Sequence, residues 1–189
     1  MLEPSDTRDD ALRQRAAWGA VLTTVSVLAT LALACATPFA ALAVIAVIFL
    51  PRREAFVLIG VNWLANQAIG YGLLHYPLTW SSFEGGLDIG IAAMASVGAS
   101  FLVYRPLLKF GTAVAIVGTL VTSFVVNEGA LFVTAMGQFA GDFAAPITLS
   151  MFYLNGIALA ALLAVQVLAT AIGLMVPRAQ LSASVARAA

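Results

Sequence analysis

The sequence predicts an all-α integral membrane protein, a compact bundle of six transmembrane helices with both termini in the cytoplasm. Two observations predict this fold. Hydrophobic residues make up 62% of the 189 residues and charged residues only 10%, whereas soluble domains average about 45–50% and about 25%. The nine basic and nine acidic residues also fall into short clusters, separated by uncharged runs long enough to cross a bilayer. This composition excludes a disordered chain, a basic nucleic-acid binder and, with one cysteine, a disulfide scaffold.

The uncharged runs give the helices in chain order. We predict helices over 16–36, 38–50, 55–75, 88–104, 110–126 and 147–176, between a cytoplasmic segment 1–15 and a cytoplasmic tail 177–189. The run 16–50 is too long for one helix, and Thr37-Pro38 divides it because proline interrupts a helix or begins a new one. At 1.5 Å per residue the helix 38–50 covers only about 20 Å. We expect it to be inclined, to thin the bilayer or to pack inside protein.

The basic residues give the orientation of the bundle. Six helices place all nine Lys and Arg residues on one side, in the segments 1–15, 51–54, 105–109 and 177–189. The opposite side carries only the acidic residues Glu84, Asp88, Glu128 and Asp142. Because basic loops stay in the cytoplasm, both termini are predicted to be cytoplasmic. The N-terminal region lacks the basic start of a cleavable signal peptide. We therefore expect a multi-pass protein of a bacterial inner membrane.

Polar side chains concentrate in the outer half of the predicted helix 55–75. Asn62 and Asn66 are four residues apart and share one face, and Gln67, Tyr71 and His75 form the neighbouring stripe with the same spacing. Amide side chains in membranes can bridge helices, and aromatic rings can form an interfacial belt. Three amides, an aromatic stripe and the single histidine at one end favour contact with a ligand instead.

Two outer segments extend this candidate site. The predicted loop 76–87 contains Trp80 and Glu84, and Asp88 follows at the start of the helix 88–104. The alternative for these two carboxylates is capping of the positive end of that helix. The predicted loop 127–146 contains Glu128, Gln138 and Asp142, and we expect it to act as a lid with a short amphipathic helix. Asn155, in the helix 147–176, completes the predicted polar ring.

Motifs of several enzyme classes are absent from the sequence. It contains no His-Glu-x-x-His, no phosphate-binding loop, no Gly-x-Ser-x-Gly and no Cys-x-x-Cys. No acidic residue lies in the inner half of a predicted span, which argues against a proton-driven carrier. We predict no prosthetic group and no nucleic-acid partner.

The whole pattern resembles the substrate-binding (S) components of the energy-coupling-factor vitamin transporters. The resemblance rests on six helices in about 190 residues, cytoplasmic termini, an outer polar cavity and the absence of an ATP-binding module. It implies a site built from outer loops and outer helix halves. It also implies that the helix 16–36 docks a coupling subunit, with its ATPases, through small residues such as Ala16, Ala20, Ala32 and Ala36.

Within that family the segment 62–77 with Trp80 most resembles the solitary cobalamin transporters of Gram-negative bacteria, called BtuM-like. In those proteins a cysteine after the third helix is the axial ligand to the cobalt of the corrinoid. This sequence has no cysteine there, since Cys35 lies in the helix 16–36. The resemblance therefore implies that His75 is the candidate axial ligand and that cobalamin is the transported ligand.

Three functions follow as hypotheses. The leading one is a membrane transport component that binds a vitamin-like micronutrient, with cobalamin or another corrinoid as the best candidate, from the outer side and carries it inward. Its predicted ligand-binding residues are Asn62, Asn66, Gln67, Tyr71, His75, Trp80, Glu84, Asp88, Glu128, Gln138, Asp142 and Asn155. The second is an integral-membrane enzyme that uses His75 and the outer carboxylates. The third is a ligand-free structural subunit, in which the polar stripe of helix 55–75 faces another helix.

Overall fold

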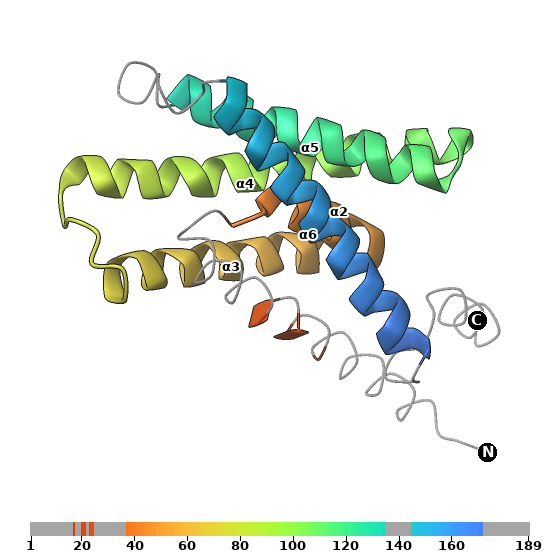
Figure 1. Cartoon of the computed structure of the whole chain (residues 1–189), viewed down its shortest axis with the longest axis horizontal. Coiled ribbons are helices and arrows are strands. Elements are labelled where there is room, and N and C mark those ends of the chain that lie inside the picture. The colour runs from red at the N-terminus through yellow and green to blue at the C-terminus, as the bar shows by residue number, and fades with distance from the viewer. Residues whose placement is uncertain (1–16, 18–19, 22, 25–36, 135–144, 172–189) are drawn as a thin grey trace.

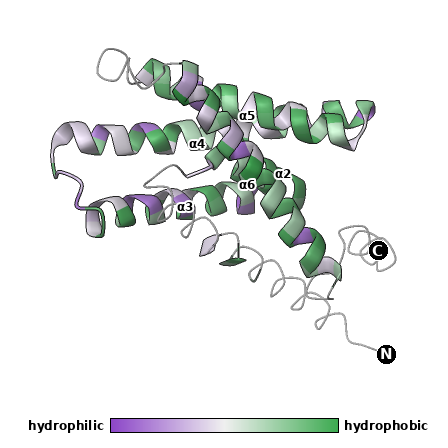
Figure 2. Ribbon diagram, viewed as in Figure 1, coloured by the Kyte–Doolittle hydropathy of each residue, from purple (hydrophilic) through white to green (hydrophobic). Residues whose placement is uncertain are grey.

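The computed structural model describes residues 17, 20, 21, 23, 24, 37–134 and 145–171, and this part of the chain is all-helical (Figure 1). Its elements are α2 (Phe39–Phe49), α3 (Arg52–Gly72), α4 (Trp80–Leu107), the 3₁₀ turn η1 (Leu108–Phe110), α5 (Thr112–Thr134) and α6 (Ala145–Ala171). Three helices are long and apolar enough to cross a membrane, namely α4 with η1, α5 and α6. The surfaces of α5 and α6 are mostly hydrophobic (Figure 2).

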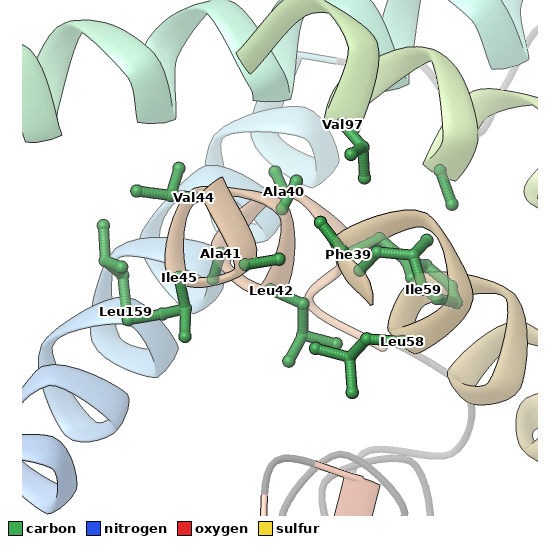
Figure 3. Close-up of a cluster of buried hydrophobic side chains, with 14 of the residues drawn as sticks. Phe39, Ala40, Ala41, Leu42, Val44, Ile45, Leu58, Ile59, Val97 and Leu159 are labelled. Atoms are coloured by element: carbon green, nitrogen blue, oxygen red, sulfur yellow. The ribbon is translucent and has the colours of Figure 1, made fainter. Parts of the chain in front are cut away.

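The short helix α2 lies at the centre of the bundle and contacts α3, α4, α5 and α6. It begins after Pro38 and ends at Leu50, whose extended backbone leads into Pro51. Its sequence is apolar on every side, which is the pattern of a helix surrounded by protein. Nine of its eleven residues are buried, and Leu42 and Ile45 are among the largest of these side chains (Figure 3). The helix α2 lies within the predicted bounds 38–50, is too short to be one of the three candidate membrane spans, and packs inside the protein.

The helices α3, α4 and α5 lie side by side, and α6 crosses them (Figure 1). The segment 73–79 joins α3 to α4, and the two helices run in opposite directions (Figure 1). The indole Nε1 of Trp63 in α3 donates to the carbonyl oxygen of Gly86 in α4 at 2.7 Å. Gly111, with φ of 109°, provides the left-handed turn between η1 and α5. As a result α5 also runs opposite to α4 and packs extensively against it.

The predicted loops 76–87 and 127–146 are both too long, because helices occupy part of each. The helix α4 already begins at Trp80, where the Thr79 hydroxyl caps it by accepting from the Ser82 N–H at 3.3 Å. Glu84 and Asp88 therefore lie inside α4 rather than in a loop or at its start. The helix α5 likewise continues through Asn127 and Glu128 to Thr134.

Smaller differences concern the remaining helix ends. The helix α3 begins at Arg52 and ends at Gly72, three residues before the predicted bounds at both ends. The basic pair thus forms its first turn, and Pro51 precedes it. The helix α6 begins at Ala145, while residues 172–176 lie outside the described part. Most of the predicted helix 16–36 lies outside it too, so five helices are described in full.

Candidate functional site

An open, aromatic-lined hollow lies where α3 connects to α4. Its lining residues are Tyr71, Leu78, Thr79, Trp80 and Phe83, and its volume is about 310 Å³. The rings of Trp80 and Phe83, one turn apart in α4, have their centroids 5.9 Å apart. Trp80 is 72% exposed, and the Tyr71 hydroxyl lies 3.3 Å from the Ser82 hydroxyl. Two of the predicted binding residues, Tyr71 and Trp80, therefore come together here.

The connection that closes this end of α3 contains a residue in a rare conformation. His75 has φ of 55° and is the one non-glycine residue with positive φ in the described part of the chain. After it, the Tyr76 N–H donates to the Gly70 carbonyl oxygen at 3.0 Å. The Tyr76 ring folds so close to α3 that a Cβ at Gly70 would lie 2.8 Å from it. The His75 side chain is left exposed beside the α3 end.

The three amides predicted for the ligand do not line the hollow. Asn66 is 5% exposed, and its Nδ2 donates to the Thr37 hydroxyl at 2.8 Å. Gln67 Nε2 donates to the Asn66 Oδ1 at 3.1 Å. Asn62 is 1% exposed, and its Nδ2 donates to the Leu58 carbonyl oxygen at 2.8 Å. Asn66 and Gln67 thus form a short chain of hydrogen bonds to the residue that precedes α2.

Asn155, in α6, forms a hydrogen bond with the same end of α2. Its Oδ1 accepts a hydrogen bond from the Ala41 N–H at 3.1 Å, and its Nδ2 donates to the Met151 carbonyl oxygen at 2.9 Å. The first N–H groups of a helix have no partner within the helix, and Pro38 provides no side-chain cap. Asn155, in α6, therefore supplies a cap that the local sequence lacks. Asn155 is one of the predicted ligand-binding residues, and the structure places it at the start of α2, inside the bundle.

A serine pair missed by the sequence analysis completes this arrangement. The Ser123 hydroxyl donates to the Ala40 carbonyl oxygen at 3.3 Å, and the Ser96 hydroxyl donates to the Ser123 carbonyl oxygen at 3.1 Å. We call Thr37, Asn66, Ser123 and Asn155 the polar node, because each bonds to α2 or to the residues just before it. Hydroxyl residues spaced by four, Ser96 with Ser100 on α4 and Thr119 with Ser123 on α5, were the available signal, but serine and threonine are common in membrane helices.

Several buried polar atoms have no hydrogen-bond partner among the residues that the structure describes. They are the Asn62 Oδ1, the Asn127 Oδ1, the Gln166 Oε1 and the hydroxyls of Ser100 and Thr119. Asn127 lies one turn beyond Ser123 on α5 and is 9% exposed, yet its Oδ1 accepts nothing. Such atoms lower stability, because a buried polar group without a partner costs free energy.

The predicted carboxylates lie apart from the hollow's lining. Glu84 and Asp88 are half-buried on α4, and Glu128 is half-buried on α5. Gln138 and Asp142 lie outside the described residues. Within the described residues no group of three or more His, Cys, Asp and Glu side chains is arranged to hold a metal ion.

The arrangement separates two chemical roles. The hollow offers exposed aromatic faces for stacking, with one hydroxyl pair for hydrogen bonding. The polar node satisfies helix ends inside the bundle and leaves little hydrogen-bonding capacity for a ligand. A search of known protein families, of curated proteins and of solved structures found no match to the chain.

Proposed function

We propose that the protein is a membrane transport component that binds a vitamin-like micronutrient, best a corrinoid such as cobalamin, in the aromatic hollow and carries it inward. The observation that carries this proposal is the hollow itself, with Tyr71, Trp80 and Phe83 around it and His75 in the adjoining connection. The resemblance of the segment 62–77 with Trp80 to solitary cobalamin transporters supports the choice of ligand.

The exposed rings support a planar ligand. Trp80 is 72% exposed and Phe83 50% exposed, and Leu78 beside them is 90% exposed. A stacked ring contributes about 0.5–1.5 kcal/mol beyond the apolar area that it buries. Such surfaces at the end of a bundle therefore favour a flat, largely apolar ligand face. The volume of about 310 Å³ is enough for one edge of a corrinoid, so the rest of the ligand would extend outward.

The backbone of His75 supports a specific role for its imidazole. A non-glycine residue in the left-handed region costs roughly 1–2 kcal/mol, and glycine avoids that cost. His75 lies three residues after the end of α3 at Gly72, in a backbone conformation that favours glycine. A histidine at this costly position suits a side chain needed for binding, and a neutral imidazole nitrogen is a good ligand for cobalt.

The charges of the described residues support the proposed topology. Arg52 and Arg53 begin α3, and Arg105 and Lys109 end α4 and η1, so these four cations share one end of the bundle. Glu84 lies near the opposite end. Under the positive-inside rule the basic end faces the cytoplasm. We propose six transmembrane helices, both termini in the cytoplasm, a bacterial inner membrane, and the segment 16–36 as the dock for a coupling subunit with its ATPases.

Replacing His75 with glycine separates binding from folding. We expect His75→Gly to raise the free energy of unfolding by up to about 1 kcal/mol, because glycine adopts the left-handed backbone conformation without strain. We expect the same variant to lose corrinoid uptake, measured as growth of a corrinoid-dependent strain on limiting vitamin B12. His75→Ala is the control, since it also lacks the imidazole but keeps the backbone cost. Normal growth with both variants would refute the role of His75.

Replacing Trp80 with alanine tests the hollow. Because Trp80 is 72% exposed, we expect little change in stability but a roughly tenfold loss in corrinoid affinity, which corresponds to about 1.4 kcal/mol of stacking. Isothermal titration in detergent measures the affinity. The control is Tyr153→Ala, which removes a ring that is 62% exposed on α6 and away from the hollow. Equal losses in both variants would contradict the assignment of the hollow.

A ligand-free structural subunit is the second candidate, and one observation favours it. The amides of Asn62, Asn66 and Asn155 bond within the bundle, as expected if the polar stripe of α3 serves helix packing. This candidate predicts that Trp80→Ala changes no small-molecule affinity. It also predicts that the purified protein binds no corrinoid at all.

A further inference from the structure

The end of the bundle opposite the hollow carries four exposed cations, which we call the basic end: Arg52, Arg53, Arg105 and Lys109. The first two lie in the first turn of α3, and the others lie in the last turn of α4 and in η1. Because α3 and α4 run in opposite directions, the beginning of α3 lies beside the second half of α4, where Arg52 covers the ring of Phe101. The four cations therefore lie toward the same end of the bundle, although more than 50 residues separate the two pairs in sequence.

Aromatic rings fix the position of two of these cations. The guanidinium of Arg52 lies 5.5 Å from the centroid of the Phe101 ring, which also stacks on the Phe56 ring at 6.4 Å. Arg105 follows Phe101 by one helical turn and so shares its face. Arg105 thus lies one helical turn beyond the ring that Arg52 covers.

Lys109 is held in the same way at the edge of the basic end. Its Nζ lies 4.9 Å from the centroid of the Phe110 ring, and Phe110 is 64% exposed. A cation above an exposed ring is the arrangement expected where a helix leaves hydrocarbon for the headgroup region.

The described residues supply little negative charge at this end. Glu54, in the first turn of α3, is the one described carboxylate there. The other three described acids are Glu84 and Asp88 in the first half of α4 and Glu128 in the second half of α5, which lie toward the opposite end. Four cations beside one carboxylate leave an excess positive charge that an external anion can neutralise.

We propose that the basic end binds the phosphate of an anionic phospholipid headgroup, with Arg52 and Arg105 as its principal contacts. Guanidinium groups bind phosphate oxygens in pairs of parallel hydrogen bonds. The acyl chains of the same lipid would pack against the exposed Phe110 ring and the apolar residues of α4 and α5. This inference needs only the membrane setting of the proposed function, and it holds whether or not the hollow binds a corrinoid.

Lipid titration tests the site directly. Protein in a neutral detergent is titrated with phosphatidylglycerol or with phosphatidylcholine of the same acyl chains. Thermal unfolding is measured at each lipid concentration, and bound lipid is measured by native mass spectrometry. We expect phosphatidylglycerol to raise the unfolding temperature and phosphatidylcholine to leave it unchanged. We expect the double variant Arg52→Gln, Arg105→Gln to bind phosphatidylglycerol roughly thirtyfold more weakly, which corresponds to about 2 kcal/mol for the loss of two basic residues near an anionic headgroup.

Two controls keep the experiment decisive. The double variant Arg178→Gln, Arg187→Gln removes the same charge elsewhere in the chain, and we expect it to bind phosphatidylglycerol normally. If the first double variant does not fold, Arg53→Gln with Lys109→Gln replaces it, and we expect a smaller but measurable weakening, because these two cations are not the principal contacts. Equal weakening by both charge-matched variants would overturn the site, as would equal stabilisation by the two lipids. Full stabilisation by inorganic phosphate alone would overturn the lipid as its occupant. Failure of the wild type to bind a corrinoid would refute the proposed function and would not bear on the lipid site.

Discussion

Asn155→Leu is expected to lower the free energy of unfolding by about 1–3 kcal/mol, because it leaves the buried Ala41 N–H without an acceptor. Asn155 Oδ1 accepts that N–H at 3.1 Å, and the residue before α2 gives no cap of its own. Leucine has the same branched shape as asparagine and the same number of side-chain heavy atoms, so the lost hydrogen bond dominates the effect. Thermal unfolding in detergent, followed by circular dichroism, measures it.

Asn127→Leu is the matched control for this prediction. The same substitution on α5 removes an amide whose Oδ1 has no partner in the described structure. We therefore expect no loss of stability, or a small gain, because an unsatisfied buried oxygen disappears. A drop for Asn127→Leu as large as that for Asn155→Leu would contradict the assignment of Asn155 as the cap of α2.

Gly90→Ala is expected to destabilise the contact between α3 and α4 by about 1–3 kcal/mol, the usual cost of overpacking. A Cβ at Gly90 would lie 2.7 Å from Cε2 of the Trp63 ring. The indole is rigid and is held by its hydrogen bond to the Gly86 carbonyl oxygen, so it has little freedom to move away. The shift in unfolding temperature and the tryptophan fluorescence of the folded protein measure the effect.

Gly98→Ala on the same helix is the control. A Cβ at Gly98 meets nothing within 4 Å, and alanine is favoured over glycine in a helix by about 1 kcal/mol. We expect this variant to be at least as stable as the wild type. A loss of stability for Gly98→Ala equal to that for Gly90→Ala would contradict the assignment of the loss to overlap with Trp63.

Apolar runs and prolines were sufficient to predict most helices. The helix α2 follows from Pro38 and from its uniformly apolar sequence, and both features act locally. The ends of α4 and α5 were harder to predict, because charged and amide residues such as Glu84 and Asn127 indicate a loop as readily as a helix. Both are compatible with a helix interior, and the hydroxyl cap of Thr79 set the true start of α4.

The candidate site was predictable only in part. The spacing by four correctly grouped Asn62 with Asn66, and Gln67 with Tyr71, on faces of α3. The spacing wrongly extended the second stripe to His75, because α3 ends at Gly72 and His75 lies in the connection with φ of 55°. It did not tell which face meets α2 and which meets the hollow, because that depends on how α3 packs against other helices. The bond from the Ala41 N–H to Asn155 joins residues 114 positions apart, and no local pattern announces such a contact.

The most direct test of the proposed function is to express the protein in cells supplied with cobalamin, purify it, and record its absorbance spectrum and mass spectrum. The account predicts a bound corrinoid, visible in the absorbance spectrum of the wild type and strongly reduced in Trp80→Ala. It also predicts that Tyr153→Ala retains the corrinoid. A wild-type protein that is folded, was exposed to cobalamin and carries no corrinoid would contradict the account.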